Sequence, residues 1–99
     1  MNEEYLQFVW KYQLIPVRLK LVSGEDLQIL HPGEHNRDSG PDFIQSRIRI
    51  NGLEWIGNTE VHIKTTMWYT HGHQSDASYE NVILHVVYEN DGTVRRDDG

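Results

Sequence analysis

Apolar residues near the N-terminus recur with the spacing of one face of an α-helix, at i, i+3, i+4 and i+7. They are Tyr5, Phe8, Val9 and Tyr12, and Leu6 and Trp10 widen the stripe. Asn2 suits the N-cap position, and Pro16 limits how far a helix can continue. The pattern therefore predicts a helix over residues 3–13 that packs its Phe8, Val9 and Tyr12 on a sheet.

From residue 17 onward, apolar positions alternate with polar ones, as expected of strands that bury one face. Residues 17–21 and 27–30 flank a turn-forming cluster at residues 23–26 and predict a β-hairpin. The polar segment 31–41 follows and predicts a long loop. Loops of this length often contain functional residues, and the alternative is an ordinary surface loop without a function of its own.

The clearest alternation runs through residues 43–50 and 53–64. Asn51-Gly52 between them is the sequence of a type I′ hairpin turn, and Gly57 is a candidate β-bulge. Residues 82–88 are apolar at both alternating sets of positions, as in a central buried strand. This order predicts an α+β fold, with one helix packed on a mostly antiparallel mixed sheet of about five strands.

Length and composition indicate the number of domains and exclude cysteine chemistry. The chain has 99 residues, 37% of them hydrophobic and 24% charged, which is typical of one globular domain. We expect residues 1–89 to form that domain. We expect the acidic segment 90–99, in which Val94 is the one apolar residue, to be a disordered tail. The absence of cysteine excludes disulfides, cysteine-ligated zinc and cysteine nucleophiles.

Charge and hydropathy restrict the classes of binding partner. Fifteen acidic residues against nine Lys and Arg give a formal net charge of −6, which disfavours sequence-independent binding to nucleic acid or anionic lipid. No apolar segment approaches the ~20 residues of a membrane helix, and the start of the chain is polar. We therefore expect a cytoplasmic protein with no membrane partner.

Two carboxylates on neighbouring strands form the first candidate site. Glu60, His62 and Lys64 share one face of their strand, and Asp42 stands at the start of the strand before it. Paired carboxylates are the ligands that Mg²⁺ or Mn²⁺ requires, and Lys64 or His62 could polarise a phosphate or activate water. The alternative is that Glu60, His62 and Lys64 are the solvated face of an ordinary strand.

The register of the hairpin decides whether the two carboxylates meet. Counting back from the turn without a defect places Asp42 opposite Val61, on the wrong face for Glu60. One extra residue bulged at Gly57 brings Asp42 opposite His62, and the carboxylates then converge.

Histidines form a second candidate site. His71 and His73, with Asp76 as a third ligand, match an arrangement that binds zinc or iron. His62 and His85 are further candidates nearby. The alternative for His85, within a buried strand, is a hydrogen-bonded core histidine.

Several short blocks along the chain carry a family resemblance. They are Glu3–Leu6, Trp10–Tyr12, Gly40–Phe43, Gly57–His62, Trp68–His73, Asp76, Tyr79 and Val82–Val87. In this order they resemble an uncharacterised bacterial family of the Bacteroidetes type, domain-of-unknown-function family 2851. That family has no assigned activity and is several times longer. The resemblance therefore implies an N-terminal portion, with self-association or a downstream domain as expectations.

A second resemblance concerns pattern. A helix bearing an acid, strands, Pro41-Asp42 and then Glu60 on the following strand is similar to the PD-(D/E)xK nuclease superfamily. Lys64 departs from that pattern, because His62 occupies the position two residues after Glu60. The resemblance implies a restriction-endonuclease-like fold.

The same resemblance implies a metal-dependent phosphodiesterase that acts on nucleic acid. Asp42 and Glu60 would bind Mg²⁺ or Mn²⁺, and Lys64 or His62 would assist the attacking water. Glu3 or Glu4 would complete the site. Two alternatives stay open, a non-catalytic binding or interdomain scaffold and a Zn²⁺ site at His71 and His73.

Overall fold

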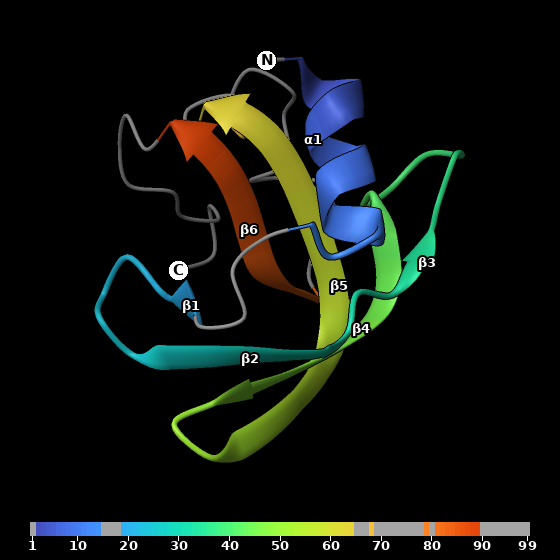
Figure 1. Cartoon of the computed structure of the whole chain (residues 1–99). Coiled ribbons are helices and arrows are strands. Elements are labelled where there is room, and N and C mark those ends of the chain that lie inside the picture. The colour runs from blue at the N-terminus through green and yellow to red at the C-terminus, as the bar shows by residue number, and fades with distance from the viewer. Residues whose placement is uncertain (1, 15–18, 65–67, 69–78, 80, 90–99) are drawn as a thin grey trace.

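The structure is a computed structural model that describes residues 2–14, 19–64, 68, 79 and 81–89 (Figure 1). The predicted tail at residues 90–99 lies outside these described residues. The elements in chain order are α1 (Glu3–Lys11), β1 (Leu19–Lys20), β2 (Asp26–His31), β3 (Glu34–His35), β4 (Phe43–Ile50), β5 (Leu53–Lys64) and β6 (Val82–Glu89). The α+β prediction is confirmed, and the described residues form six strands in place of about five.

The helix begins where the sequence predicts but buries a different face. Asn2 caps it, because its Oδ1 accepts the Tyr5 N–H at 2.7 Å. Leu6 and Trp10 are buried, whereas Phe8 and Tyr12 are 49% and 56% exposed, so the predicted packing face was wrong for these two.

Trp10 determines how α1 sits on the sheet. Its ring lies edge-on to Phe43 with centroids 6.5 Å apart, and its indole N–H donates to the Pro32 carbonyl at 3.1 Å. Burial of the large Trp10 ring, together with a hydrogen bond from its N–H, stabilises the fold more than burial of Phe8 and Tyr12 would. The core cluster consists of Leu6, Trp10, Leu27, Phe43, Ile48, Val61 and Leu84.

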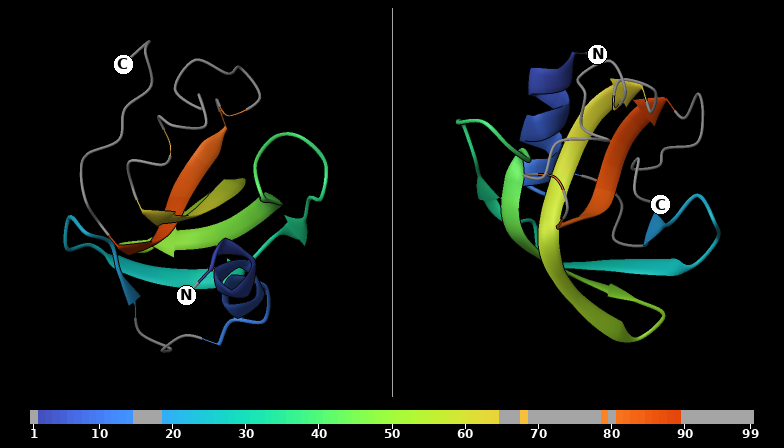
Figure 2. Two further views of the ribbon diagram at one scale, coloured as in Figure 1. Left: turned by 90° about the horizontal axis from the view of Figure 1, so that it is seen from above. Right: turned by 180° about the vertical axis from the view of Figure 1, so that it is seen from behind.

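The sheet has the order β1-β2-β4-β5-β6, and β3 pairs with β4 beside this path (Figure 2). β4 pairs antiparallel with both β2 and β5, whereas β6 runs parallel to β5. β6 is therefore the last strand of the described order and not a central one, which corrects the prediction. Its apolar run reflects covering of both faces, because Leu84 joins the core and His85 contacts the Trp68 ring at 5.5 Å.

The β4–β5 hairpin confirms the predicted turn but moves the bulge. Asn51 and Gly52 have φ values of 47° and 85°, as a type I′ turn requires. The register shift lies within β4, between Phe43 and Ser46, and not at Gly57. Gln45 adopts φ 56° there, and its N–H donates to the Asn58 side chain at 3.1 Å.

Gly57 has a different role from the predicted bulge. A Cβ at this position would lie 2.5 Å from the Ile83 side chain and 2.9 Å from the Asn81 carbonyl oxygen. The glycine therefore permits the close approach of the chain that enters β6. Because the extra residue is on β4, Phe43 pairs with Thr59, and Asp42 comes beside Glu60 in place of the predicted His62.

None of the described helices is long and apolar enough to cross a membrane.

Candidate functional site

The loop before β4 is organised by Asn36, which fixes the position of Asp42. The Asn36 side-chain amide donates to the carbonyls of Ser39 and Pro41 at 3.0 and 2.9 Å. Its backbone N–H donates to the Asp42 carbonyl at 2.8 Å. The predicted loop 31–41 also contains the two residues of β3, which pair with the start of β4. These hydrogen bonds and the pairing of β3 therefore order the loop and place Asp42 at the edge of the sheet.

Asp42 and Glu60 meet, although through a different register from the predicted one. Asp42 Oδ2 accepts the Val61 N–H at 2.9 Å. Glu60 is 2% exposed, and its pKa is raised to about 10. Burial is the largest cause, followed by the hydrogen bond with Asp42 and the negative charges of Asp42 and Glu3. At neutral pH, Glu60 is therefore a neutral acid bonded to Asp42.

His62 and Lys64, the other two residues of the first candidate site, have different environments. His62 is buried, and its Nδ1 lies in a hydrogen bond with Nε2 of His85 at 2.8 Å. The interpretation of His85 as a hydrogen-bonded histidine in its strand agrees with this contact. Lys64 is exposed at the end of β5. Of the two, Lys64 is the side chain that can reach a bound molecule.

The second candidate site, His71, His73 and Asp76, lies outside the described residues. Within the part of the chain that the structure describes, no three or more His, Asp or Glu side chains are grouped so as to hold a metal ion. An ion at Asp42 and Glu60 would thus rely on water or substrate oxygens for its other ligands, as Mg²⁺ commonly does.

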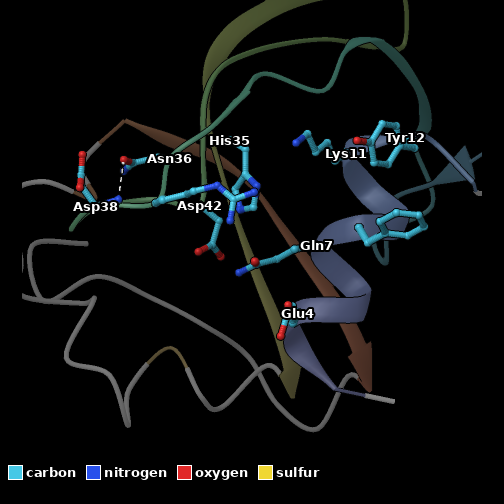
Figure 3. Close-up of a pocket in the computed structure, with 10 residues that line it drawn as sticks. Glu4, Gln7, Lys11, Tyr12, His35, Asn36, Asp38 and Asp42 are labelled. Atoms are coloured by element: carbon cyan, nitrogen blue, oxygen red, sulfur yellow. Dashed lines mark hydrogen bonds between the residues drawn. The ribbon is translucent and has the colours of Figure 1, made fainter.

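A cleft of about 490 Å³ opens between α1 and the loop that carries Asp42 (Figure 3). Its lining consists of Glu4, Gln7, Phe8, Lys11 and Tyr12 on the helix and His35, Asn36, Arg37, Asp38 and Asp42 opposite. Figure 3 shows the Asp42 carboxylate directed toward Gln7 and Glu4. Asp42 is among the lining residues and Glu60 is not, so Asp42 is the accessible member of the carboxyl pair.

The cleft wall contains a histidine that is kept neutral. The His35 ring stacks on Phe43, with centroids 4.9 Å apart and planes at 14°. Burial lowers the pKa of His35, and the nearby cations Arg37 and Lys11 lower it further. Sequence reasoning missed His35, Arg37 and Lys11 as residues of the site. The length of the segment 31–41 was a signal for His35 and Arg37, whereas Lys11 lies on α1 and had none.

Tyr79 supports the Asp42 loop from another part of the chain. Its hydroxyl donates to the Gly40 carbonyl at 3.0 Å, and its ring lies edge-on to Trp68 at 5.9 Å. Both aromatic side chains are buried. This contact could not be predicted from the sequence, because it joins residues 39 positions apart.

Comparison with known proteins decides the family. The family model described as "Protein of unknown function (DUF2851)" matches residues 3–99. The chain belongs to the DUF2851 family. This result confirms the family resemblance, and it leaves the nuclease likeness without a counterpart. No curated protein and no solved structure matches this DUF2851 chain.

Proposed function

We propose that this DUF2851 chain is a nuclease-like, metal-dependent phosphodiesterase module with Asp42 and Glu60 as the ligands of Mg²⁺ or Mn²⁺. The observation that carries the proposal is the convergence of these carboxyl groups, one directly before β4 and the other on β5, with Asp42 on the wall of an open cleft. A buried acid pressed against a second carboxyl is costly for a fold, and such costs concentrate at functional sites.

The order of the elements supports the same proposal. An acid-bearing helix precedes the antiparallel strands, Pro41-Asp42 leads into β4, and Glu60 lies on β5. This is the arrangement that the resemblance to the PD-(D/E)xK superfamily implies. Glu4 lines the cleft and the charge of Glu3 acts on Glu60, so either could complete the site.

The donor set fits a hard divalent cation. Mg²⁺ in proteins is often held by one or two carboxylates together with water and phosphate oxygens. Binding would require Glu60 to lose its proton, so affinity would rise with pH. A bound ion would supply positive charge to a phosphoryl group and to an attacking water.

The other residues of the site have separate tasks under this proposal. Lys11 and Arg37 on the cleft walls would attract the phosphates of a nucleic acid. Lys64, exposed on the same β5 face as Glu60, would stabilise developing negative charge. His62 is buried against His85 and would position β5 without contacting substrate.

One observation favours a non-catalytic scaffold as the second candidate. The hydrogen bond from the Val61 N–H to Asp42 Oδ2 satisfies a backbone donor where β4 has not yet begun. A side chain that caps a strand in this way needs no metal. The scaffold then explains Asp42 structurally, and the cleft would be an interaction surface.

Melting curves with and without Mn²⁺ separate the two candidates. We expect Mn²⁺ at ~10–100 times its Kd to stabilise the protein by ~1–3 kcal/mol, and Asp42→Asn to abolish this gain. Asp38→Asn is the matched control, because Asp38 is an exposed acid of the same cleft. It should keep the full gain.

Hydrolysis of a labelled oligonucleotide is the second readout. Activity should require Mn²⁺ or Mg²⁺, fall at least ~100-fold in Asp42→Asn and persist in Asp38→Asn. If the melting curve does not shift with Mn²⁺ and the oligonucleotide is not hydrolysed, the non-catalytic scaffold is the candidate that stands. A shift with Zn²⁺ that survives Asp42→Asn and disappears in His73→Ala would assign the metal to the histidines instead.

A further inference from the structure

Helix α1 exposes several aromatic rings on the side that does not pack on the core. Tyr5, Phe8 and Tyr12 are each about half exposed. Phe8 and Tyr12 line the cleft, whereas Tyr5 is not among its lining residues. Large apolar rings that lie side by side on a protein surface usually contact a partner. Phe8 and Tyr12 are therefore the rings that a molecule in the cleft would contact.

The geometry of these two rings shows how a flat ligand would meet them. The centroids of Phe8 and Tyr12 are 5.0 Å apart, and their planes make an angle of 59°. A third ring between two others needs their planes ~7 Å apart, twice the ~3.5 Å contact distance between carbon atoms. A flat ligand would therefore stack on one ring and meet the other at an angle, and both arrangements are favourable for aromatic groups.

Two cationic side chains lie beside the rings. The Lys11 Nζ is 5.5 Å from the centroid of the Tyr12 ring. Arg37 is on the opposite wall of the cleft. The positive charges of Arg37 and Lys11 both help to lower the pKa of His35, so the two cations lie near the same part of the cleft. This part of the cleft combines exposed aromatic rings with positive charge.

The aromatic rings and the carboxylates occupy different ends of the cleft. Glu4 lies in the first turn of α1 and Lys11 in the last, which separates them by ~10 Å along the helix axis. Figure 3 shows the Asp42 carboxylate directed toward the Glu4 end, with Lys11 and Tyr12 at the other end of the helix. A strand that lies along the cleft would thus place one phosphate at the carboxylates and a neighbouring nucleotide at the rings.

We propose that the substrate of this site is single-stranded nucleic acid, with one unpaired base stacked on Phe8 and Tyr12. Lys11 and Arg37 hold the phosphate of that nucleotide. A nucleotide combines a flat ring with a negative charge, and this end of the cleft offers a partner for each. The inference rests on the proposed phosphodiesterase function and adds the class of substrate.

The same contacts exclude a duplex. In a double helix, the faces of each base are covered by the neighbouring base pairs, so a protein ring can stack only on a base that is unpaired. Stacking is available to every base, because each has a flat aromatic face. We therefore expect a preference for single strands without a strong preference for sequence.

Competition binding with three oligonucleotides tests the inference. They are a single strand with non-hydrolysable linkages, the same strand without its bases, and the corresponding duplex. In Mn²⁺ and at one fixed salt concentration, we expect the single strand to bind at least ~5-fold more tightly than either of the others. This factor is the lower end of what one stacked base contributes.

Variants of the rings separate base stacking from phosphate binding. Phe8→Leu and Tyr12→Leu should each weaken binding of the single strand by ~5-fold and leave binding of the strand without bases unchanged. Lys11→Ala should weaken binding of both strands, because it removes a phosphate contact. Trp55→Leu is the matched control, since Trp55 is half exposed on β5 and does not line the cleft. It should change neither affinity, and circular dichroism would verify that all four variants fold.

The outcomes distinguish this inference from the proposed function. Equal binding of the three oligonucleotides, or an equal loss for both strands in Phe8→Leu, would overturn the single-stranded substrate and leave the phosphodiesterase standing. Phe8-dependent binding of the single strand without hydrolysis of a cleavable one would support the binding surface and refute the phosphodiesterase. If none of the three binds in Mn²⁺, both proposals are refuted.

Discussion

At the scale of single residues, Glu60 is the most unusual group of the described chain. Its carboxyl is almost completely buried and, in its protonated form, donates a hydrogen bond to Asp42. Burial disfavours the charged form, and a second negative charge nearby disfavours it further. Glu60 thus keeps its proton at neutral pH, which makes the stability of the fold sensitive to pH.

The direction of that sensitivity follows from proton binding. Glu60 has a pKa of about 10 in the folded chain and an ordinary value of 4.5 when unfolded. Between these values the folded chain binds one more proton, so stability falls as pH rises, by at most about 1.4 kcal/mol per unit. Glu60→Gln removes this titration. We expect its stability relative to wild type to increase from about pH 5 to about pH 9 in chelator-containing buffer.

Urea unfolding at several pH values measures this difference. Glu54→Gln is the control, because Glu54 is exposed and its ion pair lies on the surface. Its stability curve should run parallel to that of wild type. A Glu60→Gln curve parallel to wild type as well would show that Glu60 is already ionised in the folded chain.

At the scale of elements, helix α1 divides sharply into a buried and an exposed side. Trp10 is buried against Phe43 and donates to Pro32. Phe8 is half-exposed, and its ring centroid lies 6.3 Å from that of Tyr5 and 5.0 Å from that of Tyr12. We expect Trp10→Ala to lower the free energy of unfolding by ~3–5 kcal/mol and Phe8→Ala by less than ~1 kcal/mol. Chemical denaturation of both variants checks this, and equal losses would contradict the described packing.

The strands show how far a sequence pattern can predict this fold. The bounds of β4 and β5 match the predicted residues 43–50 and 53–64, because period-two alternation and Asn51-Gly52 act locally. The helix start was predictable for the same reason. The helix face was not, since Trp10 gains its position from Pro32 and Phe43, which are distant in sequence.

The candidate site was predictable in its residues but not in its geometry. Asp42 and Glu60 were found from residue type and strand spacing, yet the predicted bulge was at the wrong residue. Gln45 adopts a left-handed backbone conformation, which non-glycine residues seldom take, and its N–H donates to Asn58 on the next strand. The cleft was not predictable, because Lys11 and Arg37 meet only through tertiary packing.

At the scale of the whole molecule, the charge distribution restricts what the cleft can bind. The chain has a formal net charge of −6, and three of the cleft-lining residues, Glu4, Asp38 and Asp42, are acidic. Lys11 and Arg37 are the two cationic groups on its walls. A polyanion would therefore be repelled unless a divalent cation offsets the carboxylates. The proposed metal would act on binding as well as on chemistry.

Binding of a single-stranded oligonucleotide with non-hydrolysable linkages tests this balance. We expect binding with Mn²⁺ and none with a chelator, because only the ion offsets the acidic cleft. Two phosphate contacts predict a slope of about −1.4 for log K against log salt, and Lys11→Ala or Arg37→Ala should each reduce it by about 0.7. Arg49→Ala is the control, since Arg49 bonds to Gln28 on β2, away from the cleft. Fluorescence anisotropy across a salt series gives both quantities. Equal binding in chelator, or a slope that neither cleft variant changes, would place the nucleic acid elsewhere on the molecule and remove the cleft from the proposed function.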